Sequence, residues 1–473
     1  MQNKKAICWF RQDLRLHDNE ALSQAISSAD IVYPVYVFDT RTMGDYGKYG
    51  FRKTGKYRAK FLIESIVDLK KSLSAKGLDL IIRIGQPEEV IYELANELKT
   101  SWVFCNRERT TEELYVQDQL EQNLWTIGQE VRYSRGKMLF YTADLPFPVN
   151  HTPDTFTTFR KEVERFTSIR KVINCDFDKL LPHVSNIEIG EVPQLSDFNY
   201  EDDFEPYLPG GETAGLTRLQ SYLWDTDHIA AYKTTRNGSF GMDYSSKFSA
   251  YLAHGCLSPK QIYWELQRYE EERTKNDSTY WMVFELMWRD YFRLIGKKYE
   301  EKIFLKGGIK ETERDDLTDN MNMFQIWAEG RTGYPFVDAS MIQLNETGFM
   351  SNRGRQNVAS FLINDMHVNW QIGAEYFESL LIDYDPCSNW GNWIYIAGVG
   401  NDPRENRYFN TVLQSKKYDS NGDFIKAWCP GLKSLPPSVV HYPSAQSDDE
   451  LLKYDVILGR DFPKPIIKSE QLT

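Results

Sequence analysis

Short apolar segments alternate with amphipathic segments along the first 140 residues. The apolar segments have the length of buried strands, and they lie at 6–10, 31–38, 78–84 and 102–105. Between them, 61–73 and 87–98 carry apolar residues at helical spacing, and the second opens on a proline, which suits the first turn of a helix. This alternation predicts a parallel, doubly wound sheet with helices on both faces.

The remaining residues divide into a connector, a helical part and a tail. Prolines and acidic residues interrupt the pattern from 141 to 214, which indicates a linker with one short helix near 157–166. Helical periodicity then prevails, and helices are expected at 216–224, 259–272, 280–299, 356–370 and 374–381. We therefore predict an α/β domain at 1–140, a linker at 141–214, an all-α domain at 215–443 and a tail without obvious structure at 444–473.

Composition limits the classes of protein that need to be considered. The chain has 473 residues, 41% of them hydrophobic and 26% charged, which is typical of a soluble protein with two or three domains. A net charge of -12 argues against coating nucleic acid by bulk electrostatics, so a DNA contact would need a local site. The six scattered cysteines argue against a disulfide framework or a metal cluster. Neither a targeting peptide nor an apolar run of about 20 residues is recognisable, so we expect a cytoplasmic protein without membrane contact.

Aromatic and acidic side chains share one face of the helix expected at 280–299. Trp281, Glu285, Trp288 and Phe292 stand at positions i, i+4, i+7 and i+11. The spacing alone favours ordinary core packing. A carboxylate within this stripe is harder to explain, because burying it unpaired costs several kcal/mol. A flat ligand with polar edges, such as a nucleobase, is the alternative.

Two further segments combine charges and hydroxyls. The segment 238–249 places serines and a lysine before a helical pattern, which fits helix caps, their commoner role, or a phosphate cradle. Within the segment 330–400, two arginines and two aspartates stand in a hydrophobic helical context: Arg353, Arg355, Asp383 and Asp385. Structural ion pairs would explain them only in part, because buried pairs do not reliably stabilise a fold.

These segments resemble the photolyase/cryptochrome family, and the resemblance covers nearly the whole chain. WFRQDLRLHDN at 9–19 resembles the first strand and loop of the family, and 330–408, with GFMSNRGRQ and DYDPCSNWGNWIY, resembles its FAD-domain signature. The resemblance implies an α/β antenna domain, a linker and an all-helical domain that binds FAD. Carried over by position, the residues implied to contact FAD are Tyr232, Ser245, Ser246, Lys247, Phe248, Ser249, Arg289, Arg355, Asp383, Asp385 and Asn389.

The resemblance also implies individual roles at the flavin. Arg355 and Asp383 match a pair that flanks the isoalloxazine, with Asp385 beside them. Asn389 matches the residue that faces flavin N5. Pairing with each other and with the flavin would account for the buried charges.

A light-driven activity follows from the same resemblance: a deoxyribodipyrimidine photo-lyase that splits cyclobutane pyrimidine dimers by electron transfer from excited reduced FAD. Glu285 matches the acid that hydrogen-bonds a dimer carbonyl, and Trp288 matches the platform on which the dimer stacks. Asn352 matches a residue near both the adenine and the lesion. Such enzymes flip the dimer out of the helix, and a damaged pair costs less to unstack.

Two positions resemble the DASH-type cryptochromes within this family. Gln356 stands where conventional dimer photolyases carry a methionine, and Tyr395 stands where they carry a second cleft tryptophan. A smaller contact area with the dimer suits single-stranded DNA, where no flipping cost is paid. The expected partner is therefore damaged DNA, preferably single-stranded, bound by a monomer. A blue-light photoreceptor with the same FAD site is the alternative, and an NAD(P)H-dependent redox enzyme has no dinucleotide motif to support it.

Electron supply and light harvesting complete the expectations. The family reduces its flavin through three tryptophans, of which Trp393 and Trp370 match the proximal and middle ones, but Leu317 stands at the third position. Leucine cannot carry a hole, so the exit to solvent must use another residue or run less efficiently. The implied antenna is 5,10-methenyltetrahydrofolate, with Glu108 as its pterin contact; an isolated surface glutamate is otherwise a solvated charge.

Overall fold

The computed structural model describes residues 3–181, 187–404 and 407–467. The chain forms two compact units that interleave along the sequence. Unit 1 comprises Met1–Ala230, Lys247–Glu301 and Asp383–Ser388, and unit 2 comprises Ala231–Ser246, Lys302–Ile382 and Asn389–Thr473. These units group residues by contact rather than by chain order, and the predicted division into consecutive segments stays a prediction.

Unit 1 is built on a five-stranded parallel sheet in the order β3-β2-β1-β4-β5. Its strands are β1 (Lys5–Phe10), β2 (Ile31–Asp39), β3 (Ile81–Gly85), β4 (Trp102–Asn106) and β5 (Glu130–Ser134). Central β1 is apolar and buried at all but its first residue, as expected for a strand covered on both faces. The sequence prediction missed β5, because this edge strand alternates exposed and half-buried residues and has no apolar run.

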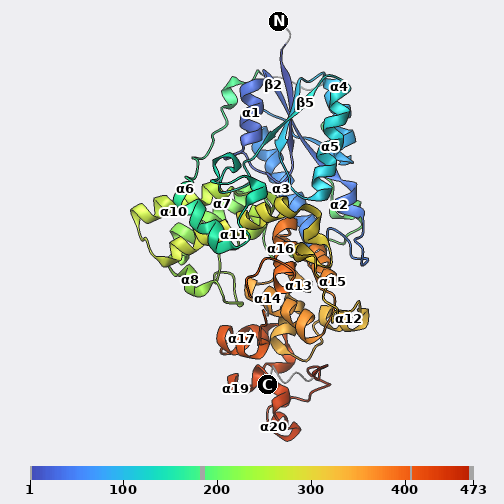
Figure 1. Cartoon of the computed structure of the whole chain (residues 1–473), viewed down its shortest axis with the longest axis vertical. Helices are drawn as coiled ribbons and strands as arrows, with labels where there is room; N and C mark the ends of the chain where they lie inside the picture. The colour runs from blue at the N-terminus through green and yellow to red at the C-terminus, as the bar shows by residue number, and fades with distance from the viewer. Residues whose placement is uncertain (1–2, 182–186, 405–406, 468–473) are drawn as a thin grey trace. The chain divides into compact units, whose positions relative to one another are not determined.

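Helices cover both faces of this sheet and extend the unit. They are α1 (Glu20–Ser28), α2 (Thr40–Gly44), α3 (Lys56–Ser74), α4 (Pro87–Leu98), α5 (Thr111–Trp125), α6 (Phe156–Phe166), α7 (Glu212–Gln220), α9 (Phe248–His254), α10 (Pro259–Glu272) and α11 (Asp277–Tyr299). Figure 1 shows α1 on one side of the sheet and α4 with α5 on the other. The apolar faces of α4 and α5 pack with the strands in one core cluster. The predicted doubly wound α/β fold is confirmed.

The described residues of unit 2 form helices joined by loops. Its helices are α8 (Tyr232–Thr235), α12 (Met321–Ala328), α13 (Pro335–Thr347), α14 (Asn352–Ser360), α15 (Trp370–Leu380), α17 (Thr411–Tyr418), α18 (Asp423–Trp428), α19 (Pro437–Val440) and α20 (Asp448–Leu452), and α16 (Pro386–Ile396) runs from unit 1 into it. The predicted all-helical C-terminal part is confirmed.

The prediction of one helix at 356–370 is wrong. Helix α14 ends at Ser360, a wider helical turn follows at Phe361–Asp365, and His367 takes a positive φ of 54°. Asn369 then caps α15, with its side-chain oxygen accepting a hydrogen bond from the Gln371 N–H at 3.0 Å. Apolar residues keep helical spacing across this break, so periodicity could not reveal it.

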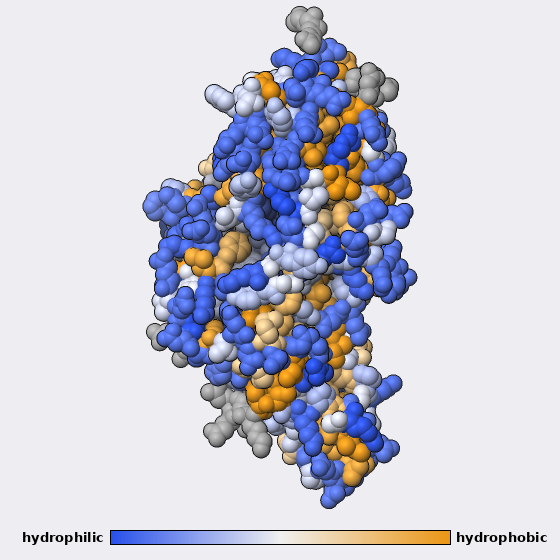
Figure 2. Space-filling model, turned by 90° about the vertical axis from the view of Figure 1, so that its right-hand side faces the viewer, coloured by the Kyte–Doolittle hydropathy of each residue, from blue (hydrophilic) through white to orange (hydrophobic). Residues whose placement is uncertain are grey.

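The described residues after Pro443, 444–467, are not an unstructured tail. They contain α20, and Leu451, Val456 and Phe462 are buried in the same core cluster as Phe336 of α13. The short, irregular elements between polar residues explain why no pattern was recognised. Most of the face visible in Figure 2 is hydrophilic, with scattered apolar patches. Among the described residues, no helix has the combined length and apolarity that a bilayer crossing requires.

Candidate functional site

Helix α11 carries a partly exposed aromatic face. The Trp288 ring stacks on Phe156 of α6, with centroids 3.8 Å apart and 9° between the planes, and it packs against Phe292 at 5.5 Å. Phe292 is buried, whereas Trp281, Glu285 and Trp288 are only half-buried. Ordinary core packing, which the spacing favoured, therefore holds only for the end of the stripe. The rest presents an aromatic surface beside a carboxylate.

The serine-rich segment before α9 offers several hydrogen-bond donors. Ser246, Lys247 and Phe248 are buried, while Ser245 is half-buried and Ser249 is exposed. Lys247 directly precedes α9 in a left-handed conformation, with φ 61° and ψ 19°. This conformation costs about 1–2 kcal/mol in a non-glycine residue, and such strain persists only where the surroundings enforce it. Hydroxyls, an ammonium group and a helix N-terminus suit a phosphate.

Other predicted flavin residues lie in α8, α14 and α16 and in the segment before α16. Tyr232 is buried at the start of α8. Asn389 in α16 is buried, and its side-chain amide donates to the Ala374 carbonyl of α15 at 3.0 Å, which fixes its orientation. The Arg355 Nε–H donates to the Met350 carbonyl at 2.9 Å in unit 2, and Asp383 is buried in unit 1. The predicted pairing of Arg355 with Asp383 stays a prediction.

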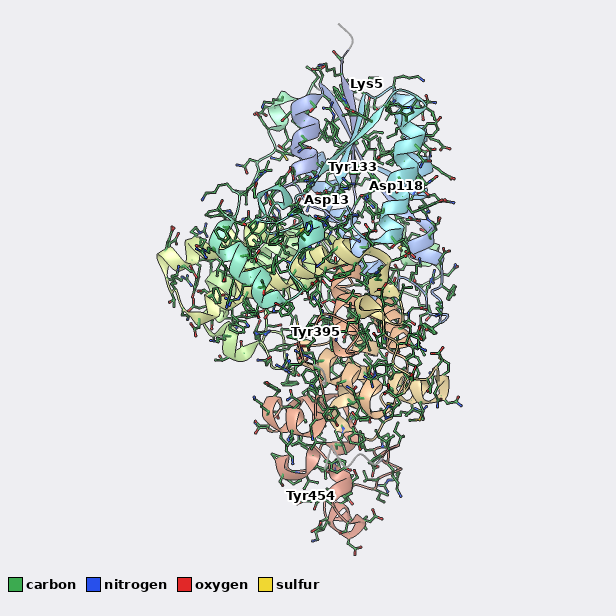
Figure 3. All side chains as sticks on the ribbon, in the orientation of Figure 1. Lys5, Asp13, Asp118, Tyr133, Tyr395 and Tyr454 are labelled. Carbon is green, nitrogen blue, oxygen red and sulfur yellow. The ribbon has the colours of Figure 1, made fainter. Side chains whose placement is uncertain are left out.

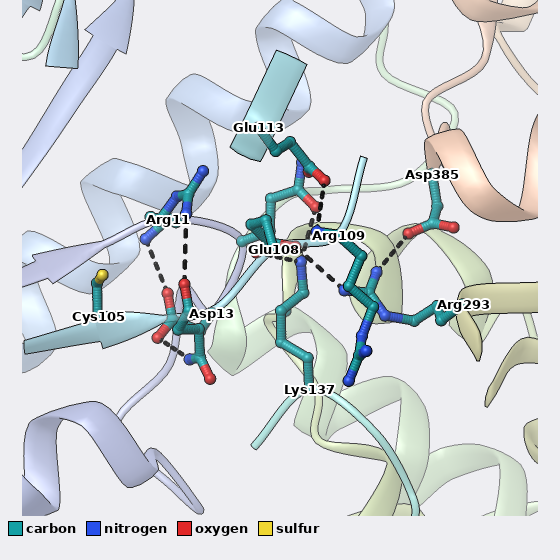
Figure 4. Close-up of polar contacts among 12 residues, drawn as sticks. Arg11, Asp13, Cys105, Glu108, Arg109, Glu113, Lys137, Arg293 and Asp385 are labelled. Atoms are coloured by element: carbon teal, nitrogen blue, oxygen red, sulfur yellow. Dashed lines mark hydrogen bonds and ion pairs between the residues drawn. The ribbon is translucent and has the colours of Figure 1, made fainter. Parts of the chain in front are cut away.

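Four buried charged groups form a cluster inside unit 1 (Figure 4). Lys137 Nζ lies 2.6 Å from Glu108 Oε1, and the Arg293 guanidinium bridges Glu108 Oε2 at 3.1 Å and Asp385 Oδ2 at 2.8 Å. All four side chains are at most 5% exposed. The cluster joins the loops after β4 and β5 to α11 and to the start of α16. Glu108 is therefore not a solvated surface charge, and that alternative is wrong.

Opposite charges keep both acids of this cluster ionised. Burial by itself raises the pKa of Asp385, but the positive charge of Arg293, followed by those of Arg289 and Lys137, lowers it to about 2. The pKa of Glu108 is likewise lowered, since Lys137 and Arg293 outweigh burial. Asp385 also accepts the Ser388 N–H at 2.8 Å, so it caps α16. Arg289 donates to the carbonyl oxygens of Lys137 and Leu252 at 2.7 and 3.1 Å, and its predicted contact with the cofactor stays a prediction.

The predicted lesion residues of unit 2 lie on α14 and α16. Asn352 is exposed in the first turn of α14. The Gln356 side-chain oxygen accepts a hydrogen bond from Arg353 at 2.9 Å. Tyr395, labelled in Figure 3, is half-buried with the Arg407 guanidinium 4.7 Å above its ring. These contacts restrain the two side chains predicted to distinguish this chain from conventional dimer photolyases.

The two matched tryptophans are buried and have aromatic neighbours that sequence reasoning missed. Trp393 contacts Trp327 at 6.5 Å and Phe377 at 5.1 Å between ring centroids, and Trp370 contacts Trp390 at 5.8 Å. Leu317 is buried, and its aliphatic side chain cannot take the place of a third tryptophan. The NWGNW pattern at 389–393 was the one signal that could have drawn attention to Trp390.

Close packing of Trp393 on α15 leads to a prediction for Gly373. A Cβ atom at this position would lie 2.4 Å from Trp393 Cη2 and 2.7 Å from Leu362 Cδ2. We expect Gly373→Ala to lower the free energy of unfolding by about 1–3 kcal/mol, measured by urea denaturation. Gly44→Ala in α2, where a Cβ meets nothing within 4 Å, is the control and should be neutral or stabilising by up to about 1 kcal/mol. Equal effects at the two positions would contradict this packing.

A cavity of about 540 Å³ opens in unit 1 at the carboxyl ends of the strands. Its lining includes Trp9 and Arg11 at the end of β1, Asp39 and Arg41 at the end of β2, and Glu108 after β4. The chain adds β2 and β3 on one side of β1 and then β4 and β5 on the other side. The strand order therefore reverses at β1, and open α/β sheets bind ligands at such a topological switch point. The aromatic side chains of the lining suit a planar molecule, and its charged side chains can bind polar groups of that molecule.

The chemistry of the residues predicted to hold FAD fits the cofactor. Serine hydroxyls, the Lys247 ammonium group and the start of α9 can receive phosphates. The oriented Asn389 amide and the Arg355 guanidinium can hydrogen-bond the polar edge of an isoalloxazine. The individual contacts remain predictions.

Known protein families and structures match almost the whole chain. The family described as DNA photolyase matches residues 6–175, and the FAD binding domain of DNA photolyase matches residues 281–473. Cryptochrome DASH from Gloeobacter violaceus is 46% identical over 472 residues, covering 99% of this chain and 94% of that protein.

Solved structures agree with this assignment. The Synechocystis sp. PCC6803 cryptochrome has a TM-score of 0.93 and 44% identity, covering 99% of this chain and 98% of that one. An archaeal photolyase from Sulfolobus tokodaii, solved with two FAD molecules, has a TM-score of 0.77 and 28% identity, covering 98% and 96%. The chain therefore belongs to the photolyase/cryptochrome family, in its DASH-type cryptochrome branch, and carries the FAD-binding domain of that family.

Proposed function

We propose that this chain is a light-driven lyase that repairs cyclobutane pyrimidine dimers, preferably in single-stranded DNA. The observation that carries the proposal is the half-buried face of α11, where Trp288 is held flat against Phe156 on the same face as Glu285. A stacking platform beside a hydrogen-bonding group is what a flipped base requires. Bound FAD would supply the electron that opens the cyclobutane ring.

The residues of the chain bind and orient the substrate in this proposal. Trp288 stacks on a pyrimidine ring, which is worth about 1–3 kcal/mol for each stacked base. Glu285 hydrogen-bonds the polar edge of the dimer. Phe156 fixes the Trp288 plane, so little side-chain entropy is lost on binding.

The preference for single strands rests on Gln356 and Tyr395. The Arg353 side chain donates a hydrogen bond to Gln356, and the Arg407 guanidinium lies over the Tyr395 ring. Gln356 and Tyr395 therefore each contact an arginine of their own unit. Less apolar surface is then available to pull a dimer out of a duplex. A single strand has no base pairs to open, so weaker binding of the dimer suffices.

The cavity at the ends of β1, β2 and β4 is our proposed antenna site, with 5,10-methenyltetrahydrofolate as its occupant. A volume of about 540 Å³ accommodates a pterin, and Glu108 lines the wall. The archaeal relative was solved with two FAD molecules, which were taken to imply a novel light-harvesting cofactor, and this supports a second chromophore in this fold. Absorption spectra of the purified protein, before and after folate addition, test this assignment.

Illumination of the reduced, FAD-loaded protein with an oligonucleotide that contains one thymine dimer tests the repair proposal. The single-stranded substrate should lose its dimer under blue light, the duplex should react more slowly, and dark samples should stay unchanged. The active species is proposed to be a cytoplasmic monomer, so activity per chain should not vary with protein concentration. If the flavin is bound and reduced but neither substrate reacts, the photoreceptor alternative takes the place of repair.

A further inference from the structure

Trp390 offers the exit that Leu317 cannot provide. We propose that Trp390 is the terminal hole carrier during light-driven reduction of the flavin, and that the Glu378 carboxylate takes its indole proton. The inference rests on the proposed light-driven function, because photoexcited oxidised FAD is the electron acceptor. It assigns roles to two residues that no sequence pattern had singled out.

Helix α15 brings Trp393 and Trp370 to the same element, and a ring contact connects Trp370 with Trp390. Trp393 packs on α15 at Gly373, and Trp370 begins that same helix. The Trp370 and Trp390 rings are 5.8 Å apart between centroids with an interplanar angle of 78°. Trp390 is 8% exposed, whereas Trp370 is 1% exposed. Trp390 is therefore nearer to solvent than the tryptophan that precedes it on the route.

The indole N–H of Trp390 faces a base. Trp390 Nε1 donates to Glu378 Oε2 of α15 at 3.3 Å, and Glu378 is half-buried. An indole that has lost an electron is a far stronger acid than neutral indole, so a carboxylate at hydrogen-bond distance can accept its proton. Loss of the proton traps the hole, because return of the electron alone would leave an indole anion.

Three neighbouring aromatic groups donate hydrogen bonds to carbonyl or amide oxygens. The indole N–H groups of Trp327 and Trp370 donate to the backbone carbonyls of Val358 and Lys306, at 3.0 and 3.1 Å. The Tyr376 hydroxyl donates to the Asn345 amide oxygen at 2.6 Å, and burial raises the pKa of that phenol. Carbonyl and amide oxygens are very weak bases, so a hole on these rings would not be trapped by proton loss.

The sequence of steps conserves electrons and protons. Trp393 loses one electron to the photoexcited flavin. Trp370 then reduces oxidised Trp393, and Trp390 reduces oxidised Trp370. The Nε1 proton of Trp390 moves to Glu378, which leaves a neutral indolyl radical and a carboxylic acid. An external thiolate then gives one electron to the radical, and Glu378 returns the proton.

Transient absorption and electron paramagnetic resonance of the FAD-loaded protein test this assignment. The wild-type protein should form a long-lived neutral tryptophan radical, and Trp390→Phe should lower its yield roughly tenfold or more. Glu378→Gln should still form the Trp390 radical, but as a cation that keeps its proton. The absorption of this cation should decay faster than the wild-type radical, and its decay should not slow in deuterated solvent. Glu378→Asp should restore the neutral radical in part.

Matched measurements separate this inference from other failures. Trp125→Phe removes an 83% exposed tryptophan of α5 and should behave as wild type. Flavin content and urea midpoints show whether Trp390→Phe is folded, and Trp390→Tyr provides a second variant with an oxidisable ring. A wild-type yield in Trp390→Phe, or an unchanged neutral radical in Glu378→Gln, would overturn the proposal. Repair by chemically reduced wild-type protein is measured separately, so failure of repair would leave the radical assignment intact.

Discussion

Replacing Glu285 with alanine is expected to lower the rate of dimer repair roughly 10- to 100-fold while FAD stays bound. The side chain stands half-buried on the same face of α11 as the Trp288 platform, where the polar edge of a stacked dimer needs a partner. A hydrogen bond that involves an ionisable group is worth about 1.5–3 kcal/mol, and each 1.4 kcal/mol or so corresponds to about tenfold in rate.

Dimer loss under blue light, normalised to bound FAD, measures this effect. Glu285→Gln retains a hydrogen-bonding group and should lose less activity than Glu285→Ala. Glu272→Ala is the control, because Glu272 lies on α10 with a 58% exposed side chain. Full repair by Glu285→Ala would remove Glu285 from the mechanism, and loss of FAD from the variant would show that the side chain supports the fold instead.

Arg293→Met should destabilise the protein by about 3–5 kcal/mol. Arg293 is the cation shared by Glu108 and Asp385, and all three side chains are at most 5% exposed. Methionine has a similar length and no charge. The substitution therefore leaves two buried carboxylates that repel each other without the cation between them. Lys137 still pairs with Glu108, whereas Asp385 loses its closest positive charge.

Urea denaturation of wild type and variants measures the cost. Arg268→Met is the control, because Arg268 on α10 is 51% exposed and its ion pairs are worth about 0–1 kcal/mol. Adding Glu108→Gln to Arg293→Met should cost less than the sum of the two single changes, since the partners are coupled. A cost for Arg293→Met no larger than that for Arg268→Met would show that the cluster does not stabilise unit 1.

The elements that could be predicted from the sequence are those whose apolar residues recur at regular spacing. Four of the five strands and the helices at 87–98 and 259–272 were predicted within a few residues of their bounds, because apolar runs and proline starts mark them. Edge strand β5 lacks such a run, and the break before Trp370 depends on the Asn369 cap. Local capping within a continuous apolar pattern is difficult to recognise from spacing alone.

The candidate site shows the same division. Trp288 and Glu285 could be singled out because their spacing places them on one helix face, and the structure shows that face half-buried. The ion pairs of Arg293 connect α11 with residues 185 positions earlier and 92 positions later in the chain. No periodicity encodes contacts at such separations, so neither this cluster nor the Trp390–Glu378 hydrogen bond could be derived before the structure.

The action spectrum of dimer loss in a single-stranded oligonucleotide tests the central claim most directly. The account predicts that repair by the reduced protein follows the absorption of its bound flavin, with any added antenna band, and is absent in the dark. Dimers that remain intact at every wavelength, in protein whose flavin is bound and reduced, would contradict it.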